Sequence, residues 1–418
     1  MHGEIITIGN ELISGRTPDL NSWYAAGRLT ASGLSVIRIT SVGDDEEMAI
    51  DALKTASASS QFVIVTGGLG STADDITCKI AADALDRPLC LDHQMLKKIK
   101  DYVKAKGIQL TPPLEKMAFM PEGAKMIHPK GGACGFSLVE KDIHFYFLPG
   151  VPEEMRHLMD AFVLPELLSL YERPPVMRQR LLKVYGLDEP RIAELFSSLQ
   201  QRSGDVVFGF YPQFPENHIT MSLRGANDAA VTAALNTVER DILSLVGPYV
   251  FAKGDQEMEE VVGHLLSERK KTLSVAESCT GGLIGHRLTN VAGSSTYFQG
   301  GVVSYSNESK NHLLHVASKT LEEYGAVSAE TAEEMARGIR KQMKADLGLA
   351  VTGIAGPTGG SREKPVGTVY IGLDSAGGTV SRRYRFFGRR KQVKLNTSMM
   401  ALDWVRRHLN GDPFLPGV

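Results

Sequence analysis

The chain has 418 residues, 43% hydrophobic and 22% charged, the composition of an ordinary globular protein that is too long for a single core. A formal net charge of −2 argues against a general nucleic-acid-binding surface, and no apolar run reaches the roughly 18–20 residues of a membrane span. The four cysteines have no C-x-x-C spacing, so neither a zinc site nor a disulfide framework is indicated.

Strand and helix patterns alternate from the first residues and predict a doubly wound, mostly parallel sheet. The expected strands are 4–8, 35–41, 62–66 and 143–148; the expected helices are 19–32, 46–59, one that begins near Asp74 and one that reaches about Tyr171. FVIVT at 62–66 is typical of a strand buried on both faces. Since no signal-peptide pattern precedes the first strand, we expect a cytoplasmic protein.

Two further domains are expected after ERPP at 172–175, which resembles a linker. The middle one is a small α+β unit with strands at 178–186, 206–213 and 218–225 and a long helix at 228–245. The third alternates again, with strands at 274–278, 300–306, 347–353, 367–374 and 382–388 and a final helix at 389–409. The predicted domains are 1–171, 176–252 and 256–412, all of α/β or α+β type.

Four loops are expected at one edge of the N-terminal sheet, where parallel strands end. TGGLGSTADDIT at 66–77 holds glycines whose backbone N–H groups suit a phosphate, and Asp74 and Asp75 there could hold a hard cation. The alternative for these two aspartates is capping of the helix that follows. Loops with Glu11 and Asp44 should reach the same edge, as should 149–155, so the sequence favours a ligand crevice.

The C-terminal domain carries several hydroxyls and one lysine that together indicate nucleophilic chemistry. Ser278 and Cys279 end one strand, Ser294 and Ser295 lie in a GSS turn, and Tyr305 and Lys310 follow in SYSNESK. A lysine whose pKa is lowered by burial or by nearby positive charge can deprotonate a serine, and a tyrosine can relay the proton. Each serine or threonine taken alone is more typical of a cap or a turn.

These motifs resemble a known family. AESCTGG, GSSTYF, YSNESK, TGIAGPTGG, KPVGTV and the closing F-x-G-x-R resemble the nicotinamide mononucleotide (NMN) deamidase domain, and TGGLGSTADDIT resembles the molybdopterin-binding-like domain of the CinA (competence/damage-inducible protein) family. The order of the two, with a small KH-like domain between them, resembles the full-length members. The middle domain lacks a basic GXXG clamp, so we interpret it as a spacer and not as an RNA-binding module.

The resemblance implies that the C-terminal domain hydrolyses the carboxamide of NMN to nicotinic acid mononucleotide and ammonia, without a cofactor, in pyridine-nucleotide salvage. It implies an active site with the residues Ser278, Ser295, Tyr305, Lys310, Thr352 and Arg390, and the glycines Gly281, Gly282 and Gly353. We favour Ser295 as the nucleophile with Lys310 as its base, and a binding or oxyanion role for Ser278. Arg390 would bind the phosphate.

For the N-terminal domain the resemblance implies hydrolysis of ADP-ribose at its pyrophosphate with a divalent metal such as Mg²⁺, in a protein that forms a homodimer. The matching positions are Glu11, Gly67, Gly68, Gly70 and Thr72 for the substrate, and Asp44, Asp74 and Asp75 for the metal. Ser71 stands where the family commonly has proline, which leaves the activity of this domain open. The alternative function is a non-catalytic pterin- or nucleotide-binding adaptor in competence or the DNA-damage response.

Overall fold

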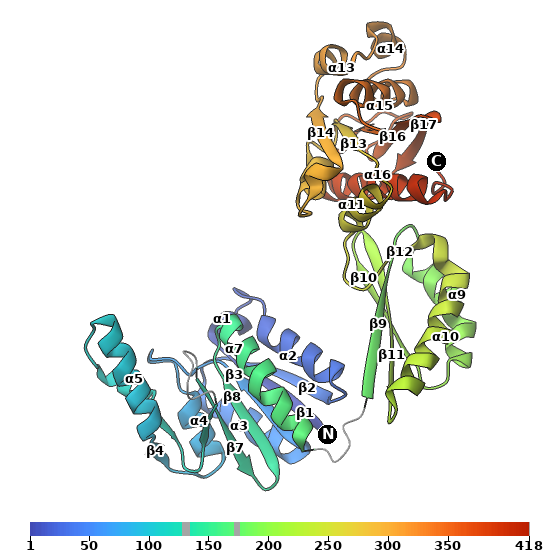
Figure 1. Cartoon of the computed structure of the whole chain (residues 1–418). Coiled ribbons are helices and arrows are strands. Elements are labelled where there is room, and N and C mark those ends of the chain that lie inside the picture. Colours follow the sequence, from blue (N-terminus) through green and yellow to red (C-terminus); the bar gives the residue numbers. More distant parts are fainter. Residues whose placement is uncertain (128–133, 171–175, 418) are drawn as a thin grey trace. The chain divides into compact units, whose positions relative to one another are not determined.

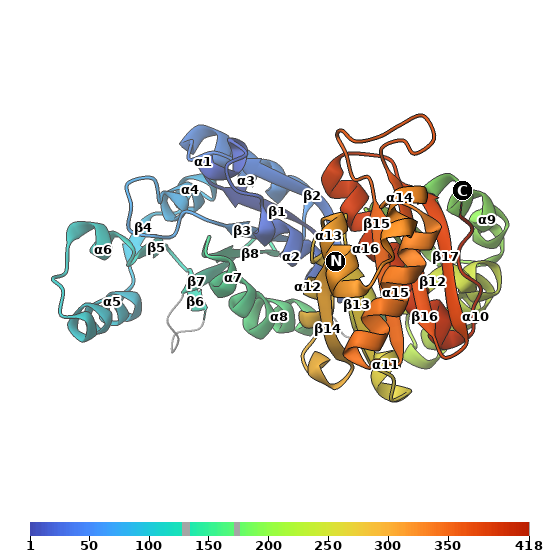
Figure 2. The ribbon, with the colours of Figure 1, turned by 90° about the horizontal axis from the view of Figure 1, so that it is seen from above.

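The computed structural model describes residues 1–127, 134–170 and 176–417 (Figures 1 and 2). The expected linker at 172–175 lies outside the described residues. The chain divides into two structural units, Met1–Arg178 with Leu223–Ala233, and Gln179–Ser222 with Ala234–Val418. Within the described residues, the search for a helix with the length and apolar character of a membrane span finds none.

Six strands form the N-terminal sheet, in the order β2-β1-β3-β8-β7-β6. They are β1 (His2–Ile8), β2 (Ser35–Val42), β3 (Phe62–Thr66), β8 (Ile143–Leu148), β7 (Gly135–Glu140) and β6 (Lys125–Ile127). The first four in spatial order run parallel, and β7 and β6 pair antiparallel beside them. The prediction for FVIVT is confirmed, because every residue of the central strand β3 is buried. The carboxyl ends of β1, β2, β3 and β8 therefore meet at one edge.

Helices cover both faces of this sheet: α1 (Asn10–Ile13), α2 (Leu20–Ala31), α3 (Glu46–Ser59), α4 (Thr77–Ala84), α7 (Pro152–Leu158) and α8 (Leu164–Ser169), with a π-helical turn at Met159–Val163. Successive strand residues point to opposite faces, so Ile5 packs with α2 and α7, whereas Ile6 packs with α3 and α4. Asp19 caps α2 as expected, accepting a 2.9 Å hydrogen bond from the Ser22 backbone. The helix expected near Asp74 begins at Thr77.

One part of the N-terminal domain has no counterpart in the predicted elements. It consists of β4 (Leu89–Leu91), α5 (His93–Lys106), α6 (Pro112–Lys116) and β5 (Phe119–Pro121). Ile99, Val103 and Ala118 form a small core of its own, and α5 stands apart from the helices that cover the sheet (Figure 1). This insertion follows α4 directly and so begins close to the glycine-rich loop.

The middle domain is the expected α+β unit. Its sheet has the order β10-β11-β9-β12, from β9 (Val176–Val184), β10 (Val207–Gln213), β11 (Glu216–Gly225) and β12 (Val250–Lys253). Its helices are α9 (Glu189–Arg202) and α10 (Asp228–Val246). Phe196 of α9 is buried and meets Phe208 and Phe210 of β10 edge to face.

The C-terminal domain is a sheet between two helical layers. The strands lie in the order β14-β13-β15-β16-β17, from β13 (Leu273–Glu277), β14 (Phe298–Val303), β15 (Leu347–Gly353), β16 (Thr368–Ser375) and β17 (Gly378–Arg385). The helices are α11 (Met258–Glu268), α12 (Leu283–Thr289), α13 (Asn307–Leu314), α14 (Ser318–Glu323), α15 (Ala329–Met343) and α16 (Arg390–Asn410). The helices α15 and α16 lie on opposite faces (Figures 1 and 2). Among the described strands of this sheet, β13, β14 and β15 run parallel, and their carboxyl ends share one edge, whereas β16 and β17 pair antiparallel.

Candidate functional site

Lys310 of α13 reaches this shared edge and is 1% exposed. Its Nζ donates to Ser278 Oγ at 3.2 Å and to the Ser304 carbonyl oxygen at 2.8 Å. No carboxylate forms an ion pair with Lys310 within the part of the chain that the structure describes. Burial lowers the pKa of the Lys310 ammonium and outweighs the opposing effect of the Cys279 thiol. The arginine-rich segment 382–391, RRYRFFGRRK, is the nearby positive charge that the sequence offered, and it is not a cause of this shift, so burial prepares the amine to act as a base.

A buried carboxylate holds the loop that carries Ser278. Glu277, the last residue of β13, accepts hydrogen bonds from the backbone N–H groups of Gly282 at 3.0 Å, Ile284 at 3.1 Å and Gly285 at 2.8 Å. Gly281 and Gly282 have φ angles of +62° and +92°, a backbone conformation that favours glycine. Sequence reasoning missed Glu277, although an acidic residue between a buried strand and a helix start is the available signal.

Arg390 and Tyr305 lie together at the surface beside this loop cluster. The Arg390 guanidinium donates to the Tyr305 hydroxyl at 3.1 Å and to the Gly356 carbonyl oxygen at 2.8 Å. The Tyr305 carbonyl oxygen is 3.5 Å from Lys310 Nζ, so the exposed tyrosine adjoins the buried amine. Arg390 is also the first residue of α16, where free backbone N–H groups favour an anion. The pair can therefore bind a phosphate close to Lys310.

Thr352 and Gly353 end β15 at the same edge. The Thr352 hydroxyl is buried and donates to the Ala326 carbonyl oxygen at 2.6 Å, so its proton is used within the fold and its lone pairs remain for a ligand. A Cβ on Gly353 would lie 2.7 Å from Val369 Cγ2, so glycine is needed there for close packing.

Ser295 lies at the opposite end of the sheet within this chain. The parallel register pairs Leu273 with Phe298 and Glu277 with Val303, so Ser295 precedes β14 whereas Ser278 follows β13. Four residues of strand separate the two ends, roughly 13 Å. Ser295 is exposed, and its hydroxyl has no hydrogen-bond partner among the described residues. Lys310 therefore contacts Ser278, and the expected pairing of Ser295 with Lys310 does not form within one chain.

The glycine loop of the N-terminal domain follows β3. Gly67 and Gly68 have φ angles of +107° and +65°, and a Cβ on Gly67 would collide with the Ile8 carbonyl oxygen. The Thr77 hydroxyl donates to the Gly67 carbonyl oxygen at 2.8 Å, and a Cβ on Gly70 would lie 2.5 Å from Asp75 Oδ2. The glycines are thus packed so closely that no side chain fits at these positions, which leaves their backbone open to the crevice, as a phosphate site requires.

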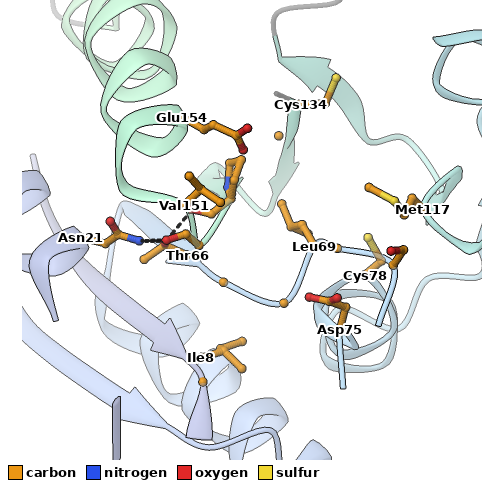
Figure 3. A pocket seen from close by; sticks show the side chains of 18 of the residues that line it. Ile8, Asn21, Thr66, Leu69, Asp75, Cys78, Met117, Cys134, Val151 and Glu154 are labelled. Atoms are coloured by element: carbon orange, nitrogen blue, oxygen red, sulfur yellow. Dashed lines mark hydrogen bonds between the residues drawn. The ribbon is translucent and has the colours of Figure 1, made fainter. Parts of the chain in front are cut away.

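The expected carboxylates line one cavity of about 720 Å³ together with this loop. Burial raises the pKa of Asp44, and repulsion from Asp74, Glu11 and Asp75 adds to the rise. Asp75 also accepts a hydrogen bond from the Thr72 backbone at 2.8 Å. Figure 3 shows Asp75, Cys78 and Met117 on one side of the cavity and Asn21, Thr66 and Val151 on the other, with Leu69 between them.

The carboxylates of this cavity could supply some of the ligands of a metal ion, and water or substrate would have to supply the rest. Among the described residues, no three His, Cys, Asp or Glu side chains converge closely enough to hold a metal ion. Mg²⁺ commonly keeps several waters and binds through one or two carboxylates and substrate phosphates. Burial first, and repulsion between the carboxylates second, raise the pKa of Asp44, and a cation would offset that repulsion, so the residues present fit that mode of binding.

Asn21 is a cavity residue that sequence reasoning missed. Its Nδ2 donates to Thr66 Oγ1 at 2.9 Å and to the Gly150 carbonyl oxygen at 2.8 Å, and Thr66 Oγ1 donates to the Pro149 carbonyl oxygen at 3.0 Å. These bonds join the ends of β3 and β8, which confirms that the loop at 149–155 reaches the crevice. No sequence signal marks Asn21, because it lies inside an ordinary amphipathic helix.

The two sites belong to an α/β protein that joins a molybdopterin-binding-like domain to a second sheet domain through a KH-like unit. Three family models match the chain: "Probable molybdopterin binding domain" over 4–169, "Damage-inducible protein CinA KH domain" over 179–252 and "CinA C-terminal domain" over 255–409. The chain belongs to the CinA family.

Relatives match nearly the full length of the chain. A CinA-like protein of Geotalea uraniireducens is 40% identical over 97% of this chain and 96% of its own length. A CinA-like protein of Geobacter sulfurreducens is 41% identical over 97% of this chain and 98% of its own length. Among solved structures, a competence/damage-inducible protein of Agrobacterium tumefaciens is 39% identical, with a TM-score of 0.36, over 37% of this chain and 97% of its own.

Proposed function

We propose that the C-terminal domain hydrolyses the carboxamide of NMN to nicotinic acid mononucleotide and ammonia. The observation that carries the proposal is the buried Lys310 amine, which lies 3.2 Å from Ser278 Oγ and has a lowered pKa. The neutral amine takes the hydroxyl proton as Ser278 attacks the amide carbonyl carbon. Lys310 then gives that proton to the departing ammonia, and water hydrolyses the acyl-enzyme to the carboxylate.

The other residues at this edge bind and orient the nucleotide. Arg390 and the N-terminus of α16 bind the phosphate, and the Tyr305 hydroxyl positions the guanidinium through their 3.1 Å contact. Ser278 replaces Ser295 as the proposed nucleophile, because the register of β13 and β14 keeps Ser295 away from the Lys310 amine.

Ammonia release from NMN by the purified chain tests the proposal. We expect turnover without added metal and in the presence of a chelator, because the proposed steps use only side chains. Folded protein that shifts its melting temperature with NMN yet releases no ammonia would contradict the proposal and favour the binding adaptor. Turnover that the chelator removes would contradict the metal-free mechanism.

The lowered pKa of Lys310 predicts a specific pH dependence of deamidation. The base is the neutral amine, so kcat/KM for NMN should rise with pH and level off above the pKa of Lys310 in the free enzyme. Because burial lowers that pKa, the midpoint of the rise should lie below the ordinary lysine value. Steady-state rates from neutral to alkaline pH measure it, and a midpoint at the ordinary lysine pKa would show that the base is not this buried amine.

We further propose that the N-terminal domain hydrolyses ADP-ribose at its pyrophosphate. The support is the cavity of about 720 Å³ in which a glycine loop faces Glu11, Asp44 and Asp74. The loop N–H groups bind phosphate oxygens, and the carboxylates would hold Mg²⁺, which supplies charge neutralisation at the pyrophosphate when bound. Measuring ribose 5-phosphate and AMP formation with Mg²⁺ and with a chelator tests this activity separately from deamidation.

Gly67→Ala should abolish nucleotide hydrolysis in the N-terminal domain while ammonia release from NMN is retained. The new Cβ collides with the Ile8 carbonyl oxygen at a φ of +107°, so the loop must move away from the cavity. The matched control is Gly15→Ala, where φ is +68° but no atom lies within 4 Å of the added carbon. Assays of both activities on both variants check the prediction, and normal ADP-ribose turnover by Gly67→Ala would exclude the loop as the phosphate site.

A further inference from the structure

The N-terminal cavity has an apolar half that the glycine loop and the carboxylates do not account for. Met95, Ile99 and Tyr102 of α5 line it, together with Leu114 of α6 and the nearby Met117 and Met120. Figure 3 shows Met117 across the cavity from Asn21 and Val151. At one end of the cavity the backbone of the glycine loop can therefore bind phosphate. At the other end the side chains of α5 and α6, with the methionines that follow, form an apolar wall.

The wall is built by the spacing of residues on α5. Met95, Ile99 and Tyr102 recur at positions i, i+4 and i+7 and so share one face of the helix. Ile99 is buried in the core of the insertion, whereas Tyr102 is 54% exposed although it lines the cavity. An exposed ring at a cavity wall offers a free face to a planar ligand.

A lysine ties this wall to the glycine loop. Lys116 of α6 donates from Nζ to the Thr72 carbonyl oxygen at 2.5 Å and to the Asp75 carbonyl oxygen at 2.9 Å. Both acceptors belong to the segment that follows the glycines, so these two hydrogen bonds fix the end of α6 against the loop. The distance between the wall and the glycine loop is therefore fixed, and a ligand that contacts both must match that distance.

We propose that the α5–α6 wall binds the heteroaromatic base of a nucleotide whose phosphates lie on the glycine loop. A cavity of about 720 Å³ suits a ligand of that size. Methionine sulfur and a tyrosine face both bind aromatic rings well, and stacking on an aromatic side chain tolerates any base. The inference rests on the proposed nucleotide site, but it concerns binding and not hydrolysis.

Calorimetric titration of the full chain with ADP-ribose and with inorganic pyrophosphate tests the wall, with a chelator present in both so that the proposed Mg²⁺-dependent hydrolysis cannot consume ADP-ribose. Tyr102→Ala should weaken ADP-ribose binding by about tenfold, the usual effect of removing a stacking ring, and leave pyrophosphate binding unchanged. Tyr102→Phe should keep the wild-type affinity because the ring remains. The matched control is Tyr211→Ala in the middle domain, since Tyr211 is 55% exposed and lies outside the cavity lining.

The outcomes separate this inference from the proposed hydrolysis. ADP-ribose that binds tightly in a Tyr102-dependent manner but is not cleaved would support the wall and contradict the pyrophosphatase. Equal losses for ADP-ribose and pyrophosphate would show that Tyr102 only supports the loop and would overturn the inference. It would also be overturned if ADP-ribose bound no more tightly than pyrophosphate, or if Tyr102→Ala bound it as the wild type does.

Discussion

Lys310→Met is expected to lower kcat for ammonia release from NMN by roughly a hundredfold to ten-thousandfold, the range found when a general base is lost. Methionine has nearly the length of lysine and no amine, so it fills the buried space beside Ser278 without being able to take a proton. Steady-state kinetics with NMN measure the loss, and circular dichroism shows whether the fold is retained.

The matched control is Lys319→Met on α14, where the lysine is exposed. We expect wild-type turnover from this variant. Near-normal turnover by Lys310→Met in folded protein would contradict the assignment of Lys310 as the base, whatever the control shows.

The kcat values of Ser278→Ala and Ser295→Ala for ammonia release should differ by a factor similar to the one expected for Lys310→Met. Ser278 Oγ is the hydroxyl that Lys310 contacts, so its removal should reduce kcat by about a hundredfold or more, because the covalent route is lost. Ser295 lies at the other end of the sheet, so Ser295→Ala should retain most of the wild-type rate. Ammonia release by the two purified variants, compared at saturating NMN, measures the difference.

The opposite result has a definite structural meaning. If Ser295→Ala were inactive and Ser278→Ala active, the attacking serine would have to come from a second copy of the chain, because the register of β14 separates Ser295 from Lys310 within one copy. Mixing Ser295→Ala with Lys310→Met protein would then restore part of the activity, since a mixed pair of chains would contain one intact combination.

The long buried strands of the fold could be predicted from sequence because burial on both faces leaves a recognisable run of apolar residues. β3 and β15 are examples, and helix caps such as Asp19 mark where the covering helices begin. The insertion after α4 was missed because β4 and β5 have three residues each, too few to show a period of two. Its helix α5 does show an amphipathic pattern, so that element could have been found.

Most members of the proposed C-terminal site could be named from sequence, whereas Glu277 was missed and the contact of Lys310 with Ser278 could not be predicted. Ser278 and Tyr305 follow the carboxyl ends of two neighbouring parallel strands and Thr352 lies at the carboxyl end of a third, which the strand pattern implies. The choice between Ser278 and Ser295 depends on which end of β14 faces which end of β13, and that is a property of register and not of composition. The cause of the lowered pKa likewise required the burial of Lys310 to be seen, because the nearby arginines were an equally reasonable source in the sequence.

Among the described residues, Lys310 is buried without an acidic partner, and this burial opposes the stability of the folded protein while it serves catalysis. An enclosed ammonium that lacks a counter-ion opposes folding wherever the unfolded chain binds the proton more tightly, which is at every pH below the ordinary lysine pKa. An uncharged side chain of similar length would remove this cost and the base together, but it would also leave the Ser304 carbonyl oxygen without its 2.8 Å donor. Catalysis and stability therefore place opposing demands on one side chain, because the charge that is unfavourable in the fold belongs to the group that takes the proton.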